Sequence, residues 1–178
     1  AVDFFFLLSG FVINYAYNDR WDKLTTRKFF SRRLIRLHPM LIMGAFIGLV
    51  CFLIGDSQQW NGTQIPLYLS IITFLLTCFM IPALPNSFNE IRGNGELFPL
   101  NGPMWSLFFE YIGNILYALF IRRLNTKRLT IVVIFLFIAH SIFTIGNLSG
   151  YGTIGVGWTF DSVNFFGGMI RMLFPFSL

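Results

Sequence analysis

Residues 103–121 read PMWSLFFEYIGNILYALFI, a nearly unbroken apolar run in which Glu110 is the only charged side chain. A membrane-spanning helix needs about 20 such residues. Apolar residues follow one another without the apolar–polar alternation of a strand, and the run is longer than the roughly ten residues of a strand in a membrane barrel. It therefore predicts a transmembrane helix.

The same pattern recurs on both sides of this run. Further apolar runs cover residues 2–17, 39–54, 65–81 and 129–146, and another begins near residue 165. Pro39, Pro66 and Pro103 each fall in the first turn of a predicted helix, where the missing N–H is harmless. The predicted fold class is all-α: a polytopic transmembrane helical bundle with about six membrane segments. Because apolar residues continue to both ends, we expect residues 1–178 to be part of a single domain cut at both ends.

Composition excludes most other classes of protein. Hydrophobic types make up 55% of the 178 residues and charged types 12%, and the mean hydropathy is +0.66. Charged residues reach about 25% in soluble domains, so a soluble or disordered chain is excluded. Cys51 and Cys78 lie inside apolar runs without metal-ligand spacing. We expect no metal site and no disulfide scaffold.

The positive charge is concentrated in two short stretches. Of the 13 basic residues, seven lie in residues 19–36 and four in residues 122–128. Basic loops between apolar runs are typical of the cytoplasmic side of a membrane protein and of contact with anionic lipid headgroups. We therefore expect the lipid bilayer as a partner, and no nucleic acid.

The two basic stretches constrain the topology. Three predicted runs separate them, and an odd number of crossings would place the stretches on opposite sides. Either one basic stretch faces outward or, as we favour, one run does not cross fully. Residues 83–102, which are rich in Asn, Gly and Pro, would then dip back into the membrane. Because irregular backbone at that depth lines a cavity or lies inside the protein, this predicts a cavity beside Trp105.

Glu110 is the first candidate for chemistry. Ser106, Glu110 and Asn114 follow each other at i and i+4, so they share one helix face, and we expect this polar face to point to the protein interior or to a wet cavity. A charged group within the membrane costs at least about 2.5 kcal/mol and commonly marks a functional site. Glu110 could act in acid–base chemistry or orient a histidine, or it could form a structural hydrogen bond between helices.

Three arginines are further candidates. Arg33 and Arg36 are one helical turn apart, so they could bind one phosphate or pyrophosphate, or serve as a topology signal at the headgroups. Arg171 could bind an anionic substrate group, pair with Glu110, or extend to the interface. His38 and His140 have no partner that the sequence identifies, and a structural role is favoured for both.

Three segments together resemble the acyltransferase-3 family of membrane acyltransferases. They are VDFFFLLSGF at residues 2–11, RRLIRLHP at residues 32–39 and PMWSLFFE at residues 103–110. Arg171 followed by Phe176 resembles a late motif of the same family. The three segments occur in the family's order, and the resemblance extends over nearly the whole chain.

The resemblance implies transfer of an acyl group, often acetyl, from acyl-CoA to a hydroxyl of a carbohydrate or related envelope acceptor. It implies a multi-pass protein of the bacterial inner membrane, with acyl-CoA as co-substrate and no bound cofactor. Arg33 and Arg36 would bind the CoA phosphates, and Glu110 would support catalysis. The residues implied to line the substrate cavity are Trp105, Ser106, Asn114 and Arg171.

The family's essential histidine lies before the first of these motifs. Neither His38 nor His140 matches it, so we expect the catalytic histidine to be missing from this sequence and the fragment to be inactive alone. A membrane carrier or channel for a lipid-linked sugar or an anion is the main alternative. A sensor or scaffold without chemistry is a third possibility.

Overall fold

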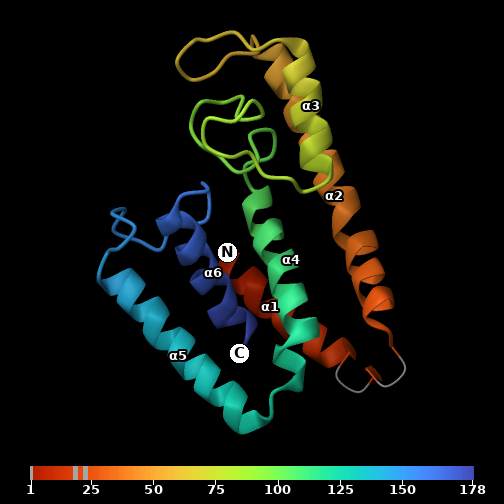
Figure 1. Ribbon diagram of the computed structural model, residues 1–178, viewed down its shortest axis with the longest axis vertical. Coiled ribbons are helices and arrows are strands. Elements are labelled where there is room, and N and C mark those ends of the chain that lie inside the picture. Colours follow the sequence, from red (N-terminus) through yellow and green to blue (C-terminus); the bar gives the residue numbers. More distant parts are fainter. Residues whose placement is uncertain (1, 18–19, 22–23) are drawn as a thin grey trace. The chain divides into compact units, whose positions relative to one another are not determined.

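The computed structural model describes residues 2–17, 20–21 and 24–178. Within these residues the chain forms six α-helices and one short 3-10 helix, and the only β contacts are isolated bridges (Figure 1). The α-helices are α1 (Val2–Tyr17), α2 (Thr26–Ile54), α3 (Leu67–Cys78), α4 (Met104–Leu119), α5 (Thr126–Ile145) and α6 (Ser162–Phe176), and the 3-10 helix is η2 (Ile121–Arg123). The predicted all-α class is confirmed. Asp19, Asp22 and Lys23 of the first basic stretch lie outside the described residues.

The start of α2 differs from the prediction. The helix begins at Thr26, so Pro39 lies inside it rather than in its first turn. The apolar run that begins at residue 39 reflects insertion into the membrane and carries no signal for where the helix starts. Residues 26–38 are helical because Phe29, Arg33 and Leu37 repeat at i+4 and all three are buried.

Three helical segments are long and apolar enough to cross a membrane: Thr26–Ile54, Met104–Arg123 and Thr126–Ile145. By contrast, the 12 residues of α3 extend over about 18 Å, less than the roughly 30 Å of a bilayer core. This length agrees with our expectation that one run between the basic stretches does not cross fully. The re-entrant path of residues 83–102 stays a prediction.

The chain divides into two compact units, of which the first contains Ala1–Arg32, Phe108–Gly157 and Ser162–Leu178. In this unit α6 packs against both α1 and α5. Glycine permits the close approach of α1 and α6, since a Cβ on Gly10 would lie 2.0 Å from the carbonyl oxygen of Phe176. Similarly, a Cβ on Gly168 would lie 2.6 Å from the ring of Phe109.

The second unit contains Arg33–Leu107 and Trp158–Asp161. Here α3 packs along α2, with the rings of Phe46 and Phe74 6.3 Å apart. The segment between α3 and α4 is non-helical, as predicted, and it packs on α2. At Gly48 of α2 this packing is so close that a Cβ would lie 1.6 Å from the carbonyl oxygen of Leu100.

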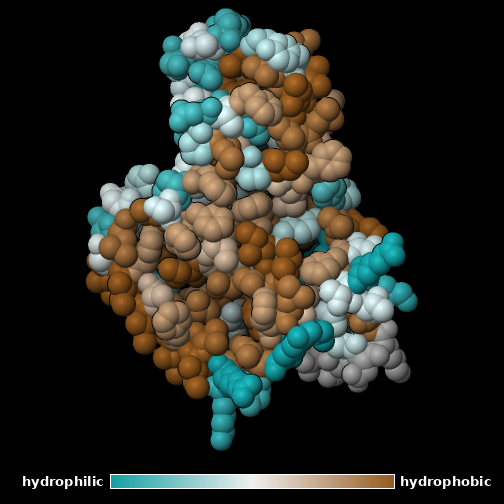
Figure 2. Space-filling view, in the orientation of Figure 1, coloured by the Kyte–Doolittle hydropathy of each residue, from teal (hydrophilic) through white to brown (hydrophobic). Residues whose placement is uncertain are grey.

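Much of the helical surface is apolar, as expected where a helix faces lipid. In α5, Ile131 and Phe135 are 67% and 68% exposed. Figure 2 shows the brown, hydrophobic surface that covers this helix at the lower left of the view. A soluble protein would not expose such a continuous apolar face, so we assign it to contact with the bilayer.

Candidate functional site

Glu110 is held inside the first unit by its position on α4. Its side chain is 2% exposed, and Asn114, one turn later, is fully buried. The hydroxyl of Ser9 on α1 donates to Oε1 of Glu110 at 2.5 Å. Nδ2 of Asn114 donates to the backbone carbonyl of Glu110 at 2.9 Å. The predicted interior face of this helix is confirmed for Glu110 and Asn114.

Burying a carboxylate is costly unless hydrogen bonds compensate it, and a hydroxyl that donates to a charged acceptor forms one of the stronger bonds. The bond from Ser9 therefore fixes one oxygen of Glu110 in a defined direction. Such a carboxylate can orient a neighbouring donor or balance its charge. Gly113 leaves space on the same helix for α6, because a Cβ there would lie 2.9 Å from the sulfur of Met172.

Ser106 has a different environment from the other two polar residues of α4. Its hydroxyl donates to the carbonyl of Pro103 at 2.9 Å, within the first turn of the helix, and the side chain is partly exposed. A serine that bonds to its own helix turn satisfies its hydroxyl locally. The structure thus places Ser106 on the predicted face without joining it to Ser9 and Glu110.

Arg171 on α6 forms an ion pair with Asp3 on α1. Its Nε lies 2.7 Å from Oδ1 of Asp3, and Nη2 donates to Oδ2 at 3.3 Å. The Arg171 side chain is 13% exposed and that of Asp3 is 47% exposed. Arg171 is therefore paired with Asp3, an acid that was not among the three alternatives left open by the sequence: an anionic substrate group, Glu110, or the membrane interface. The two-point contact joins the first and last helices of the first unit.

Arg33 and Arg36 lie one turn apart on α2, as predicted, but their exposure differs. Arg33 is 3% exposed because it continues the buried face of the helix between Phe29 and Leu37. Arg36, one position before Leu37, is exposed. An anion that contacts both guanidinium groups must therefore lie at the edge of the buried face of α2.

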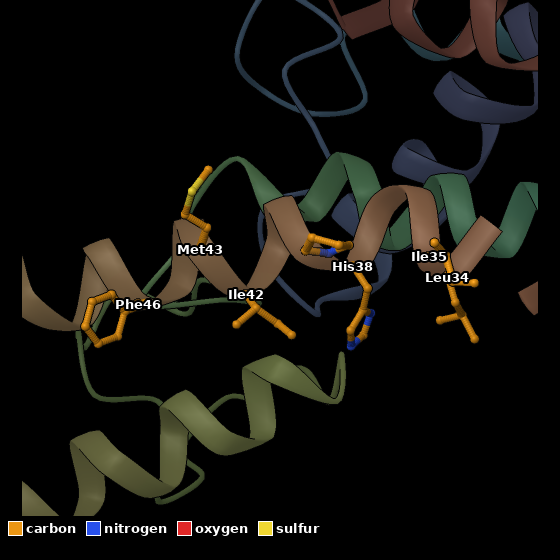
Figure 3. Close-up of a pocket in the computed structure, with 7 residues that line it drawn as sticks. Leu34, Ile35, His38, Ile42, Met43 and Phe46 are labelled. Atoms are coloured by element: carbon orange, nitrogen blue, oxygen red, sulfur yellow. The ribbon is translucent and has the colours of Figure 1, made fainter. Parts of the chain in front are cut away.

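Next to this arginine pair, α2 carries an apolar groove (Figure 3). The residues that line it are Leu34, Ile35, His38, Pro39, Ile42, Met43 and Phe46. His38 and Ile42 point to the same side of the helix. A histidine among apolar side chains favours the structural role predicted for it. His140, on α5, packs its ring 5.3 Å from that of Phe174.

Trp105 belongs to the second unit, where it is 3% exposed and its ring lies 5.6 Å from that of Trp158. The carbonyl of Trp158 accepts a hydrogen bond from the N–H of Leu97 at 2.8 Å. The irregular segment before α4 is thereby fixed to the loop that precedes α6. The cavity predicted beside Trp105 stays a prediction.

Among the residues that the structure describes, no group of three or more His, Cys, Asp or Glu side chains could hold a metal ion. The structure brings Ser9 together with Glu110, and Asp3 together with Arg171. Sequence reasoning assigned no partner to Ser9 or Asp3. The only available signal was that both residues belong to the motif at residues 2–11.

The fold and this site define the class: an all-helical integral membrane protein with a hydrogen-bonded carboxylate inside its helices. The acyltransferase-3 family, described as an acyltransferase domain, matches residues 1–178, so the chain belongs to this family. The chain is also similar to "Protein 2 in picA locus" of Rhizobium radiobacter, with 31% identity over 139 residues, which is 75% of this chain and 71% of that protein. No solved structure matches the chain.

Proposed function

We propose that this protein is a membrane O-acyltransferase that moves an acetyl group from acetyl-CoA to a hydroxyl of a carbohydrate or related envelope acceptor in the bacterial inner membrane. The family membership supports acyl transfer in general. The observation that carries the proposal for this site is the buried hydrogen bond between Ser9 and Glu110. This hydrogen bond joins the motif at residues 2–11 to the motif at residues 103–110. A purely structural contact between two helices does not need a buried carboxylate, so the bond supports a functional role for Glu110.

The reaction requires a base and a binding site for the thioester. The acceptor hydroxyl attacks the thioester carbonyl, its proton passes to a base, and the CoA thiolate leaves. We propose that the base is a histidine outside this sequence and that Glu110 orients it and balances its charge. Neither His38 nor His140 is assigned this role, and we expect residues 1–178 alone to be inactive.

The donor would be bound through its phosphates. Arg36 is exposed and Arg33 lies on the buried face of α2, so a phosphate that contacts both would bind at the edge of that face, where it could approach from the headgroup region. We further propose, residue by residue, that Trp105, Ser106, Asn114 and Arg171 line the substrate cavity. For Arg171 this role requires the substrate to compete with Asp3 or to bind beside the pair.

The test is release of free CoA from acetyl-CoA by the full-length protein in membranes. We expect Glu110→Gln to lower turnover at least tenfold, since the amide cannot balance the positive charge of an imidazolium. Glu90→Gln is the matched control, because Oε1 of Glu90 accepts from the backbone N–H groups of Asn94 and Gly95, which an amide oxygen can also do.

Two outcomes would contradict the proposal. Equal turnover in the wild type and a stably inserted Glu110→Gln protein would return Glu110 to a structural role. Movement of a lipid-linked sugar or an anion across the membrane, without release of CoA, would favour the carrier or channel instead.

A further inference from the structure

The loop between α2 and α3 forms a small hairpin of residues 57–65 within the second unit (Figure 1). Gln58 and Gln64 are paired in an antiparallel bridge. At the tip, the N–H of Gly62 donates to the carbonyl of Gln59 at 2.9 Å, and Gly62 has a φ of +84°, which glycine adopts without strain. The hairpin therefore has a defined turn at its tip.

Two hydrogen bonds fix the hairpin to the irregular segment between α3 and α4. The backbone N–H of Trp60 donates to the carbonyl of Arg92 at 3.0 Å, and Nε2 of Gln59 donates to the carbonyl of Glu90 at 3.4 Å. Nε of Arg92 in turn donates to the carbonyl of Pro99 at 3.0 Å. The backbone that carries Trp60 is thus held by the same segment that packs on α2.

Trp60 projects from this fixed turn. Its side chain is 76% exposed, although tryptophan is a large residue that is highly buried on average. A tryptophan has only two side-chain torsions to restrict, so on a fixed backbone it offers a large contact surface at low cost in conformational entropy. Such a ring suits a ligand that presents a flat apolar face.

The side chains around Trp60 are polar and uncharged. Residues 57–66 read SQQWNGTQIP and contain no Asp, Glu, Lys or Arg. Gln58 and Gln64 are both exposed, and residues directly opposite in an antiparallel pair point to the same side. Each amide offers two N–H donors and an oxygen acceptor. Figure 2 shows teal, hydrophilic side chains at the top of the view, beyond the ends of α2 and α3.

A sugar matches this combination of an aromatic ring and neutral hydrogen-bonding groups. The C–H groups on one face of a pyranose ring are apolar, and its hydroxyl groups both donate and accept hydrogen bonds. The other common use of an exposed tryptophan in a membrane protein is to anchor a helix end at the membrane interface. Lys and Arg commonly accompany Trp and Tyr in such anchors, and this hairpin has neither. The lack of charge therefore favours a neutral carbohydrate.

We propose that the hairpin of residues 57–65 binds a neutral sugar unit of the acceptor, with the sugar ring stacked on Trp60 and its hydroxyl groups bonded to Gln58 and Gln64. This inference rests on the proposed function, since it takes the acceptor to be a carbohydrate. The first basic stretch extends into the start of α2, so the hairpin at the other end of this helix belongs to the outer side of the membrane. The bound unit need not be the one that reacts, because binding of a remote unit also holds the acceptor at the protein.

The test is binding of the full-length protein to polysaccharide from the cell envelope of its source organism, freed of O-acetyl groups with mild alkali. The protein is immobilised in nanodiscs, and biolayer interferometry gives the half-saturating concentration of polysaccharide. We expect Trp60→Ala to raise this concentration roughly tenfold or more, since it removes the central aromatic contact. Trp60→Tyr, which keeps a ring, should stay within about threefold of the wild type. Gln58→Ala and Gln64→Ala should each raise the concentration roughly threefold.

Phe79→Ala is the matched control. Phe79 follows the other end of α3 and is 75% exposed, so it is as accessible as Trp60 but lies outside the hairpin. This variant should bind the polysaccharide as the wild type does. A second control uses vesicles that contain brominated phosphatidylcholine, which quenches the fluorescence of tryptophan at the membrane interface. We expect the wild type and Trp60→Phe to be quenched to the same extent, because Trp60 would not contact lipid.

The inference is wrong if Trp60→Ala binds the polysaccharide as tightly as the wild type, or if Phe79→Ala weakens binding equally. It is also wrong if Trp60→Phe removes part of the quenching by brominated lipid, since Trp60 would then be an interface anchor. Release of CoA separates this result from failure of the proposed function. If the polysaccharide stimulates release with the same half-saturating concentration in the wild type and Trp60→Ala, only the role of the hairpin is overturned. A wild type that neither binds the polysaccharide nor releases CoA would overturn both.

Discussion

At the scale of single residues, the hydroxyl of Ser9 donates a hydrogen bond that helps to compensate the burial of the Glu110 carboxylate. Replacing Ser9 by Ala removes a hydrogen bond to Oε1 of Glu110, whose side chain is 2% exposed. We expect a loss of about 1–3 kcal/mol in the free energy of unfolding, measured by titration with a denaturing detergent. We also expect lower turnover in the CoA-release assay.

Ser31→Ala is the control for this change, because Ser31 also lies on a helix but is exposed. Surface substitutions of this kind alter stability by less than about 0.5 kcal/mol. Equal stability of the Ser9→Ala and Ser31→Ala proteins would show that Ser9 contributes nothing through its hydroxyl.

The arginine pair of α2 gives a second prediction at this scale. Arg33→Gln and Arg36→Gln should each raise the KM for acetyl-CoA tenfold or more in the full-length protein, since each removes a charged donor to phosphate. The measurement is CoA release at varied acetyl-CoA concentration. Arg27→Gln, an exposed arginine earlier on the same helix, should leave KM unchanged. Normal kinetics in both Arg33 and Arg36 variants would refute phosphate binding there.

At the scale of elements, close packing on α2 fixes the irregular segment between α3 and α4. A Cβ on Gly48 would lie 1.6 Å from the carbonyl oxygen of Leu100, so Gly48→Ala must displace backbone. We expect this change to cost about 1–3 kcal/mol of stability and to lower the Tm of the purified protein.

Gly102→Ala is the matched control within the same unit. The nearest atom to its Cβ would be Oε2 of Glu96 at 4.0 Å, an ordinary contact distance. A Tm for Gly48→Ala equal to that for Gly102→Ala would mean that the irregular segment does not pack on α2 as described.

Apolar run length was enough to predict where the helices lie, and α1 matches its predicted bounds of residues 2–17. The prediction for the start of α2 was wrong because hydropathy indicates which residues lie in the membrane. A helix can begin earlier, among charged residues, as α2 does at Thr26. Helical spacing also predicted that Glu110 faces the interior. Helical spacing could not identify Ser9 as the partner of Glu110. Periodicity shows which residues share a face of one helix, but it does not show which other helix packs against that face.

At the scale of the whole molecule, the topology can be tested by labelling. The polar loop after α2 contains Asn61 and the loop before α5 contains Asn125, and both residues are exposed. In a background with Cys51 and Cys78 replaced by Ser, we expect Asn61→Cys to react with a membrane-impermeant thiol reagent from outside the cell. Asn125→Cys should react only after the membrane is opened, because it lies in the second basic stretch.

Labelling of Asn125→Cys in intact cells would contradict the arrangement in which both basic stretches face the cytoplasm. It would mean that α3, despite its 12 residues, completes a crossing, so that the second basic stretch faces outward. The double labelling thus decides between the two topologies that the charge distribution leaves open.

The ion pair between Asp3 and Arg171 joins residues that are 168 positions apart. A ribosome adds roughly 5–20 residues per second, so α1 enters the membrane on the order of ten seconds before α6 is made. During that interval the carboxylate of Asp3 has no arginine beside it, and the face of α1 that α6 covers is open. Although α1 is made well before α6, it reaches its final environment only when α6 arrives, and the insertion machinery or the surrounding lipid must shelter it until the chain has passed residue 171.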